Sequence, residues 1–264
     1  MTLVTGASGF VGAKIMEVCK DVIASPSLRG VSEDEVRRLV SESGCDAIIH
    51  TAAISDIGAC EKNPEGSYEA NVLLPIYLAN AARKYGVKLV CFSSDQVYSG
   101  HGDGGPFTES DVKPSNLYSR HKLEMENRVL DILPSAVMLR AEWMYDYYLK
   151  KGNYFMNMIN AEGEVSFSSR QFRSVTYVKE VAEQMANVLR LPGGAYNFGS
   201  ETSKSMYEIT KNFLELIGKQ IPVEDIPPYN NLWMNCQKAR NYGVIFSTVE
   251  DGLEKCARDY GYIK

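Results

Sequence analysis

A glycine-rich turn close to the N-terminus constrains the fold of this chain more than any other feature. Three glycines follow a GxxGxxG spacing between an apolar strand expected at 2–5 and a helix expected to begin near Val11. Glycine permits a tight strand-to-helix turn and lets backbone N–H groups and the helix N-terminus approach a pyrophosphate. In this context the spacing predicts a dinucleotide site, with a purely structural turn as the alternative. The residues expected to contact the cofactor there are Gly6, Ser8, Gly9, Phe10, Val11 and Gly12.

Strand-like and helix-like segments alternate through the first 140 residues. Their alternation predicts an α/β fold with a doubly wound parallel sheet that is covered on both faces. Strands are expected at 21–24, 47–51, 88–93 and 136–140, and helices at 32–41, 68–84 and 115–130. We expect residues 1–150 to form a dinucleotide-binding domain. Residues 151–264 are expected to form a smaller C-terminal substrate lobe, with about 174–200 returning to the nucleotide-binding sheet.

Composition argues against several classes of partner. The chain has 264 residues, a net charge of −5 and no basic block, so nucleic acid is not an expected partner. Its six cysteines lack CxxC spacing and it has three histidines, so neither a metal site nor a disulfide framework is expected. We expect His50 and His121 to be structural. No signal peptide is apparent, and no apolar run reaches the roughly 18 residues of a membrane span. The expectation is a soluble, cytoplasmic protein, with a homodimer as the candidate assembly.

The segment after the second expected strand bears on the choice of cofactor. An NAD site usually places an acid about 20 residues after the glycine turn, where it holds the ribose 2′-hydroxyl. Between Val22 and Ser32 this chain has no Asp or Glu, and Ser25 and Arg29 stand there instead. Because a guanidinium suits a 2′-phosphate, the segment favours NADP(H) over NAD(H). The alternative is that Arg29 only solvates a loop.

Three polar residues are candidates for carbonyl chemistry. Tyr118 and Lys122 lie four apart on an expected helix, and Ser93 and Ser94 end an expected strand whose carboxyl end faces the ligand crevice. A tyrosine acts as an acid near neutrality only if its pKa falls from about 10, which needs roughly 4 kcal/mol. A cation about 4 Å away supplies about that much at an effective dielectric of 20, so we expect Lys122 to lower the pKa of Tyr118. A solvated helix face is the alternative reading of this pair.

Several motifs in order resemble the extended short-chain dehydrogenase/reductase family, and within it the dTDP-4-dehydrorhamnose reductases. The resemblance covers about residues 1–200 well and the remainder loosely. Beyond the glycine turn it rests on His50-Thr-Ala-Ala53, Asn71, Phe92-Ser-Ser-Asp-Gln-Val-Tyr98, Phe107-Thr-Glu109, Pro114, Tyr118-Ser-Arg-His-Lys122 and Arg140-Ala-Glu-Trp-Met-Tyr145.

The resemblance implies a role for each matching position. Ser94 would hydrogen-bond the substrate carbonyl, Tyr118 would donate its proton, and Lys122 would hold the nicotinamide ribose. Trp143 would pack against the sugar, with a place in the core as the alternative. The remaining positions implied on the cofactor side are Ala52 and Ala53 beside the adenosine, Asn71 supporting the strand and helix around it, Ser93, and Tyr118 in addition to its role as proton donor.

One stretch of the chain departs from the family pattern. The family usually has Asp-Gln-x-Gly-x-Pro-Thr in its second lobe, whereas residues 170–176 read Arg-Gln-Phe-Arg-Ser-Val-Thr. Arg170 and Arg173 either bind a substrate diphosphate or are solvated. We therefore expect an NAD(P)H-dependent reductase of a 4-keto nucleotide sugar or a related carbonyl. The alternatives are an epimerase or dehydratase of the same superfamily, or a non-catalytic NADP-binding regulatory subunit like the β subunit of methionine adenosyltransferase.

The first prediction concerns the cofactor. We expect NADPH to bind at least as well as NADH, because Arg29 replaces the usual acid. Fluorescence titration of the wild type and of Arg29→Ala with both cofactors measures this, and the variant should lose affinity for NADPH alone. A clear preference for NADH that Arg29→Ala leaves unchanged would contradict the prediction.

Overall fold

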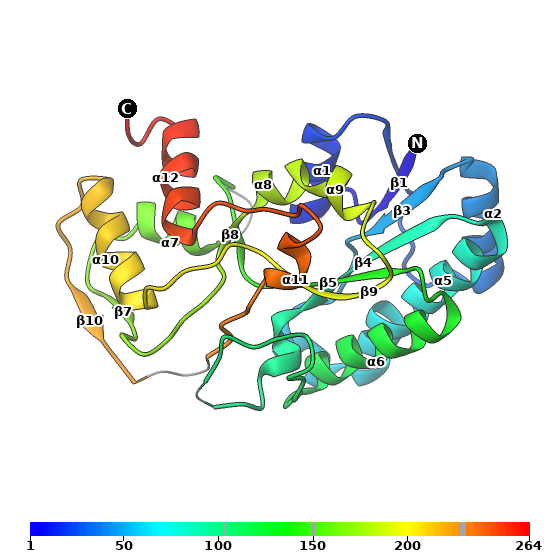
Figure 1. Cartoon of the computed structure of the whole chain (residues 1–264), viewed down its shortest axis with the longest axis horizontal. Coiled ribbons are helices and arrows are strands. Elements are labelled where there is room, and N and C mark those ends of the chain that lie inside the picture. Colours follow the sequence, from blue (N-terminus) through cyan, green and yellow to red (C-terminus); the bar gives the residue numbers. More distant parts are fainter. Residues whose placement is uncertain (103, 149–151, 228–230) are drawn as a thin grey trace.

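A six-stranded sheet forms the centre of the larger part of the molecule in the computed structural model (Figure 1), which describes residues 1–102, 104–148, 152–227 and 231–264. All its strands are parallel and lie in the order β2-β1-β3-β4-β5-β9. They are β1 (Thr2–Thr5), β2 (Val22–Ala24), β3 (Ala47–His50), β4 (Lys88–Ser94), β5 (Val137–Ala141) and β9 (Gly194–Phe198). The predicted doubly wound parallel sheet is confirmed.

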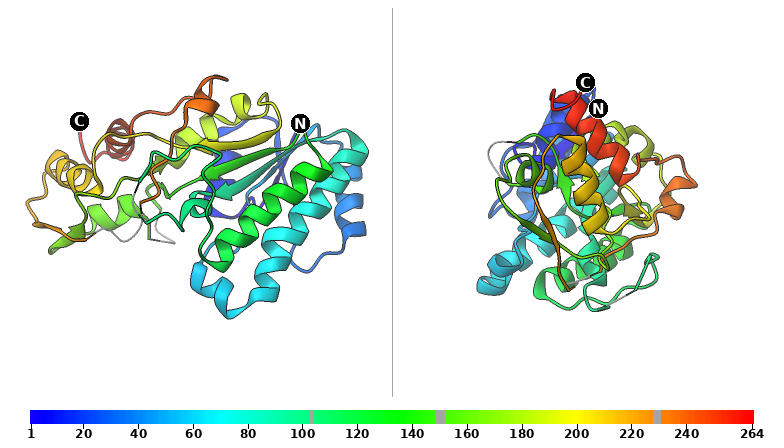
Figure 2. Two further views of the ribbon diagram at one scale, coloured as in Figure 1. Left: turned by 60° about the horizontal axis from the view of Figure 1, so that its bottom comes forward. Right: turned by 90° about the vertical axis from the view of Figure 1, so that its left-hand side faces the viewer.

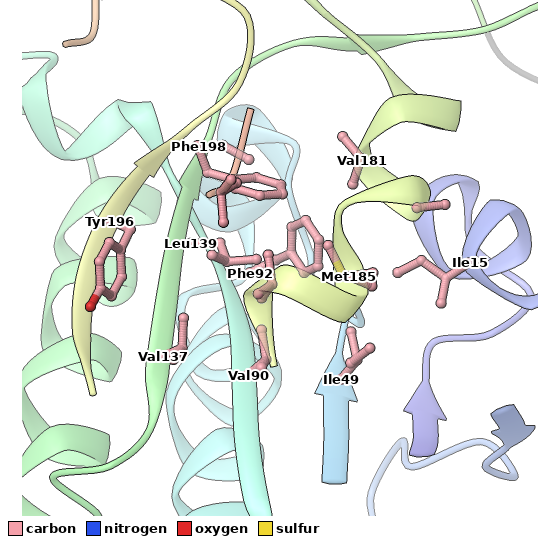
Figure 3. Packing of buried hydrophobic residues seen from close by; sticks show 14 of the residues in the cluster. Ile15, Ile49, Val90, Phe92, Val137, Leu139, Val181, Met185, Tyr196 and Phe198 are labelled. Carbon is pink, nitrogen blue, oxygen red and sulfur yellow. The ribbon is translucent and has the colours of Figure 1, made fainter. Parts of the chain in front are cut away.

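Helices cover both faces of this sheet (Figure 2, left). One face packs against α1 (Phe10–Val18), α8 (Val178–Glu183) and α9 (Met185–Val188), and the other against α2 (Glu33–Ser43), α5 (Leu74–Tyr85) and α6 (Leu117–Ile132). Figure 3 shows the first of these interfaces, where Ile15 and Met185 meet Ile49, Val90 and Leu139 of the strands. Because both faces are buried, the strands are continuous apolar runs rather than alternating ones.

Local sequence signals account for where these helices begin and end. The predicted capping box is present at the start of α2, where Ser32 and Glu35 exchange hydrogen bonds. Gly44 and Gly86 end α2 and α5 in the left-handed conformation, with φ of 60° and 69°. Within the described part of the chain, no helix is both long and apolar enough to cross a bilayer.

The segment between β3 and α5 is more broken than the sequence predicted. The predicted helix over 68–84 is present as a π-helical turn, η1 (Glu69–Leu73), followed by α5, and two short helices that were not predicted, α3 (Ile57–Lys62) and α4 (Pro64–Tyr68), precede it. A π-helical turn of this kind is often found at a functional site. It carries Asn71, whose surroundings are described below.

Beyond β5 the chain builds a second, smaller core. Two short parallel pairs, β6 (Met144–Tyr145) with β8 (Thr176–Tyr177) and β7 (Val165–Phe167) with β10 (Val223–Asp225), pack with helices at the left of Figure 1. The helices there are α7 (Tyr154–Ile159), α10 (Met206–Leu216) and α12 (Val249–Asp259). The intervening β9, α8 and α9, together with α11 (Gln237–Arg240), lie instead with the six-stranded sheet.

A buried ion pair connects α6 to the centre of the sheet. Arg140 on β5 donates three hydrogen bonds to the carboxylate of Glu126 on α6, with the shortest, from Nη2, at 2.7 Å. Glu126 also accepts from the hydroxyl of Ser93 at the end of β4, and Arg140 donates to the hydroxyl of Tyr98 at 2.9 Å. The pair therefore fixes the position of α6 relative to the ends of two strands.

The second prediction concerns the stability of this pair. Arg140→Met leaves Glu126 as an uncompensated buried charge, so we expect the free energy of unfolding to fall by about 3–5 kcal/mol. Adding Glu126→Gln removes that charge and should recover a large part of the loss. Urea unfolding followed by circular dichroism measures both.

The exposed pair of Arg128 and Glu124 on the same helix is the matched control. Arg128→Met should cost no more than about 1 kcal/mol, since exposed pairs contribute little. If the Arg140→Met single variant is as stable as the double variant, the buried charge is not the cause of the loss.

Candidate active site

A cavity of about 1580 Å³ lies at the carboxyl ends of the central strands, between the sheet and the second core. Sites for one small molecule are usually about 300–1,000 Å³, so there is room for a dinucleotide and a second ligand. Fourteen predicted site residues line its wall. They are Gly6, Ser8, Gly9, Phe10, Val11, Ser25, Arg29, Ala52, Ala53, Ser93, Ser94, Tyr118, Lys122 and Trp143. Four others, Gly12, Asn71, Arg170 and Arg173, do not line it.

The glycine turn has the geometry that a bound pyrophosphate requires. Gly6 has a φ of +76°, and a Cβ on Gly12 would lie 2.2 Å from the carbonyl oxygen of Gly6. Gly12 therefore acts through the close packing of the turn and not by contacting a ligand. No side chain caps the N-terminus of α1 and its first turn holds no acid, while Phe10 and Val11 of that turn line the cavity. The N–H groups and the dipole of this helix suit a phosphate.

The part of the cavity wall that follows β2 suits an adenosine ribose with a 2′-phosphate. Ser25 follows β2 and Arg29 lies on the loop after it, and both line the cavity. The side chain of Arg29 is exposed, which leaves it able to turn toward a phosphate. The residues present therefore fit NADP(H), which would supply or accept a hydride when bound.

Asn71 supports the cofactor site from behind rather than lining it. Its side chain is buried in the π-helical turn, where Nδ2 donates to the carbonyl oxygen of Ile54 at 2.9 Å and Oδ1 accepts from the Ile54 N–H at 3.1 Å. These bonds hold the loop that carries Ala52 and Ala53. Direct contact between Asn71 and the cofactor is therefore not supported by its position.

Ser94, Tyr118 and Lys122 meet on one wall of the cavity. Tyr118 and Lys122 come from the first turns of α6, which an Asn116–Ser119 capping box begins. The Lys122 ammonium lies 5.9 Å from the centre of the Tyr118 ring and donates to the carbonyl oxygen of Phe92 at 2.9 Å. Ser94, at the end of β4, contacts the phenol. The solvated-face alternative for Tyr118 and Lys122 is wrong, because both side chains are buried.

The expected lowering of the Tyr118 pKa by Lys122 is wrong for the protein without cofactor. Burial raises the pKa of Tyr118 above its ordinary value, and a hydrogen bond with the Ser94 hydroxyl offsets part of this. Burial also lowers the pKa of Lys122 to about 8, and its ammonium is engaged by a backbone carbonyl. The desolvation of the phenolate therefore dominates, and Tyr118 is a neutral phenol that has a proton to donate.

Neither of the two arginines of the altered stretch lines the cavity. Arg170 is exposed, and Arg173 is only 4% exposed, with its guanidinium 4.2 Å from the centre of the Trp143 ring. The expected contact between Arg173 and a substrate diphosphate is not supported, because the guanidinium of Arg173 already faces Glu142 and Asp95. The alternative that Arg173 is solvated is wrong, because its side chain is buried. Trp143 is 49% exposed on the cavity wall, so its alternative place in the core is wrong.

The sequence analysis missed two acids at the reacting end of the cavity. Asp95 and Glu142 line it beside Ser94 and Trp143, and Arg173 lies between their carboxyl groups. Both acids stand inside motifs that carried the resemblance. The pairing with Arg173 could have been inferred only from the unusual arginine at that position, because the three residues are far apart in the sequence.

The histidines take no part in the cavity wall. His50 Nδ1 is 2.6 Å from the hydroxyl of Thr5, and His121 Nδ1 is 2.9 Å from the hydroxyl of Ser67. Burial lowers the pKa of both, and that of His50 falls to about 3. Among the described residues, no group of His, Cys, Asp and Glu side chains could hold a metal ion.

Comparison with known proteins agrees with this geometry. The dTDP-4-dehydrorhamnose reductase of Mycobacterium tuberculosis is 28% identical over 194 residues, which are 69% of this chain and 64% of that protein. The spore coat polysaccharide biosynthesis protein SpsK of Bacillus subtilis is 25% identical over 232 residues, 84% of this chain and 81% of that protein.

The fold is also that of a solved relative. The crystal structure of dTDP-4-dehydrorhamnose reductase from Bacillus anthracis in complex with NADP superimposes with a TM-score of 0.86, at 23% identity, over 98% of this chain and 97% of that one. A family model described as the RmlD substrate binding domain matches residues 1–238. Since this match spans most of the chain, the resemblance is confirmed, and the protein belongs to the RmlD substrate-binding-domain family.

Proposed function

We propose that this protein is an NADP(H)-dependent oxidoreductase that reduces the keto group of a 4-keto nucleotide sugar, as a dTDP-4-dehydrorhamnose reductase does, or of a related carbonyl compound. One observation carries the proposal: Ser94, Tyr118 and Lys122 meet on one wall of a cavity that also contains the glycine turn. The names of the similar proteins favour a reductase over an epimerase or dehydratase.

The proton chemistry of the proposed reaction follows from the side chains present. NADPH held by the glycine turn and Lys122 would supply the hydride that the carbonyl carbon accepts. Tyr118 donates its phenolic proton to the carbonyl oxygen, and Ser94 hydrogen-bonds the same oxygen. Lys122 binds the nicotinamide ribose and, because it lies over the tyrosine ring, stabilises the phenolate that proton donation leaves.

The second core supplies the other side of the cavity. Trp143, Tyr154 and Asn157 line it there, and they offer an aromatic face and polar groups to a sugar or a base. Aromatic faces and a few hydrogen-bonding groups are the usual lining of a small-molecule site. A homodimer and a cytoplasmic location stay predictions from the sequence.

The third prediction tests Tyr118 as the proton donor. Tyr118→Phe removes one hydroxyl group and keeps the ring, so NADPH should still bind with wild-type affinity. Turnover of dTDP-4-dehydrorhamnose should fall by about 10²–10⁴-fold, which is typical for the loss of a general acid, and KM should change far less. The loss of NADPH absorbance measures turnover, and fluorescence titration measures binding.

Tyr85→Phe, at the exposed end of α5, is the control for the loss of a tyrosine hydroxyl and should behave like the wild type. Reduction at the wild-type rate by Tyr118→Phe would show that Tyr118 is not the acid. If the wild type binds NADPH but turns over no carbonyl compound, the non-catalytic regulatory function becomes the better proposal.

A further inference from the structure

The hydroxyl of Ser94 lies between the Tyr118 phenol on the cavity wall and the carboxyl of its sequence neighbour Asp95. Its Oγ is 2.9 Å from Oδ1 of Asp95 and accepts a hydrogen bond from the Gln96 N–H at 3.2 Å. If Asp95 is a carboxylate, it accepts the single hydroxyl proton of Ser94, which then cannot reach a substrate oxygen. If the Asp95 carboxyl is protonated, it donates to Ser94 Oγ and leaves the serine proton free for the substrate.

The surroundings of Asp95 contain more negative than positive charge. Arg173 Nη1 lies 2.6 Å from Oε1 of Glu142 and 3.9 Å from Oδ2 of Asp95. All three side chains are buried, so one guanidinium faces two carboxyl groups in a place of low polarity. An unbalanced carboxylate is costly there, and two acids in such an arrangement commonly share one proton. Tyr118 is the other titratable group that faces Asp95, and it is neutral.

The hydrogen bonds indicate which acid holds the shared proton. Glu142 accepts from Arg173 at Oε1 and from the Ser174 N–H at Oε2, so both of its oxygens face donors. Oδ2 of Asp95 is buried and has no hydrogen-bond partner. Burial raises the pKa of both carboxyls, and Arg173 offsets part of this for each. For Asp95, hydrogen bonds from Ser94 and from the backbone N–H groups of Asp95 and Gln96 offset a further part. The difference between the two acids is that each oxygen of Glu142 has a donor, whereas Oδ2 of Asp95 has none. A neutral carboxyl tolerates a buried oxygen without a donor better than a carboxylate does, so we assign the charge to Glu142 and the proton to Asp95.

We propose that Asp95 is a positioning residue which, in its protonated form, donates to Ser94 Oγ and so turns the Ser94 hydroxyl toward the substrate carbonyl, while Glu142 and Arg173 keep that proton in place. The proposal rests on the proposed function, since it concerns the same carbonyl. It predicts that turnover falls as pH rises through the deprotonation of Asp95, because Ser94 then donates to Asp95 instead.

The fourth prediction uses Glu142→Gln to change the charge balance. Arg173 is then left with Asp95 as its one carboxyl partner, which lowers the pKa of Asp95. The alkaline fall in kcat should move to lower pH. If the pKa of Asp95 falls by about one unit, kcat of the variant on the alkaline side of the profile should be about tenfold below that of the wild type at the same pH. Lys122 also titrates there, with a pKa near 8, but it is present in every variant, so the shift between variants reports on Asp95.

Asp95→Asn tests whether the serine is the group affected. An asparagine amide always donates, so Glu142→Gln should no longer shift the pH profile when Asp95→Asn is added. Asp95→Leu, of similar size but without a donor, should have a kcat at least tenfold below that of Asp95→Asn. Thermal melting and NADPH titration of each variant separate a folding defect from a change in chemistry. If Glu142→Gln shifts the profile equally with and without Asp95→Asn, the proposal is overturned.

An infrared measurement on the whole chain without cofactor is independent of any activity. At neutral pH the wild type should show the C=O stretch of a protonated, buried carboxyl, which Asp95→Asn removes. Labelling the aspartate carboxyls with ¹³C should move this band, and labelling the glutamate carboxyls should not. Absence of the band, or its movement with labelled glutamate, overturns the proposal even if no substrate is found. A band that behaves as expected in a protein without reductase activity contradicts only the proposed function.

Discussion

The burial of polar groups where β4 and β5 end is the constraint on which the rest of this site depends. Around these strand ends a phenol, an ammonium, three carboxyls and two guanidinium groups are taken out of water, namely those of Tyr118, Lys122, Asp95, Glu126, Glu142, Arg140 and Arg173. Each must then find a partner or change its protonation state, because an unpaired buried charge is costly. The neutral phenol of Tyr118 and the lowered pKa of Lys122 are both direct results of this desolvation.

Two buried arginines meet this constraint in different ways. Arg140 is matched by one acid, Glu126, and serves to hold α6 against the sheet, so that pair is structural. Arg173 is shared by two acids, Glu142 and Asp95, and lies against Trp143 at the cavity. The first arrangement is balanced in charge. The second has two carboxyls for one guanidinium, and a proton retained on the acid beside Ser94 restores the balance of charge.

In the cofactor half of the cavity, the site depends on the close packing of the glycine turn. A Cβ on Gly12 would overlap the carbonyl of Gly6, so the helix can approach the strand only because that side chain is absent. The uncapped first turn of α1 then faces the cavity. A phosphate placed there would supply the acceptors that no side chain of the described turn supplies.

Local patterns in the sequence determined the sheet, the glycine turn, the capping box of α2 and the convergence of Ser94, Tyr118 and Lys122, because each depends on residues close in the chain or on a fixed crossover geometry. Only the tertiary structure decided the direction of the Tyr118 pKa, since desolvation depends on everything packed around the phenol. It also decided the role of Arg173. The sequence placed that arginine in an altered stretch, but its partners Asp95 and Glu142 come from separate strand ends, and their distances are set by how the second core packs on the sheet.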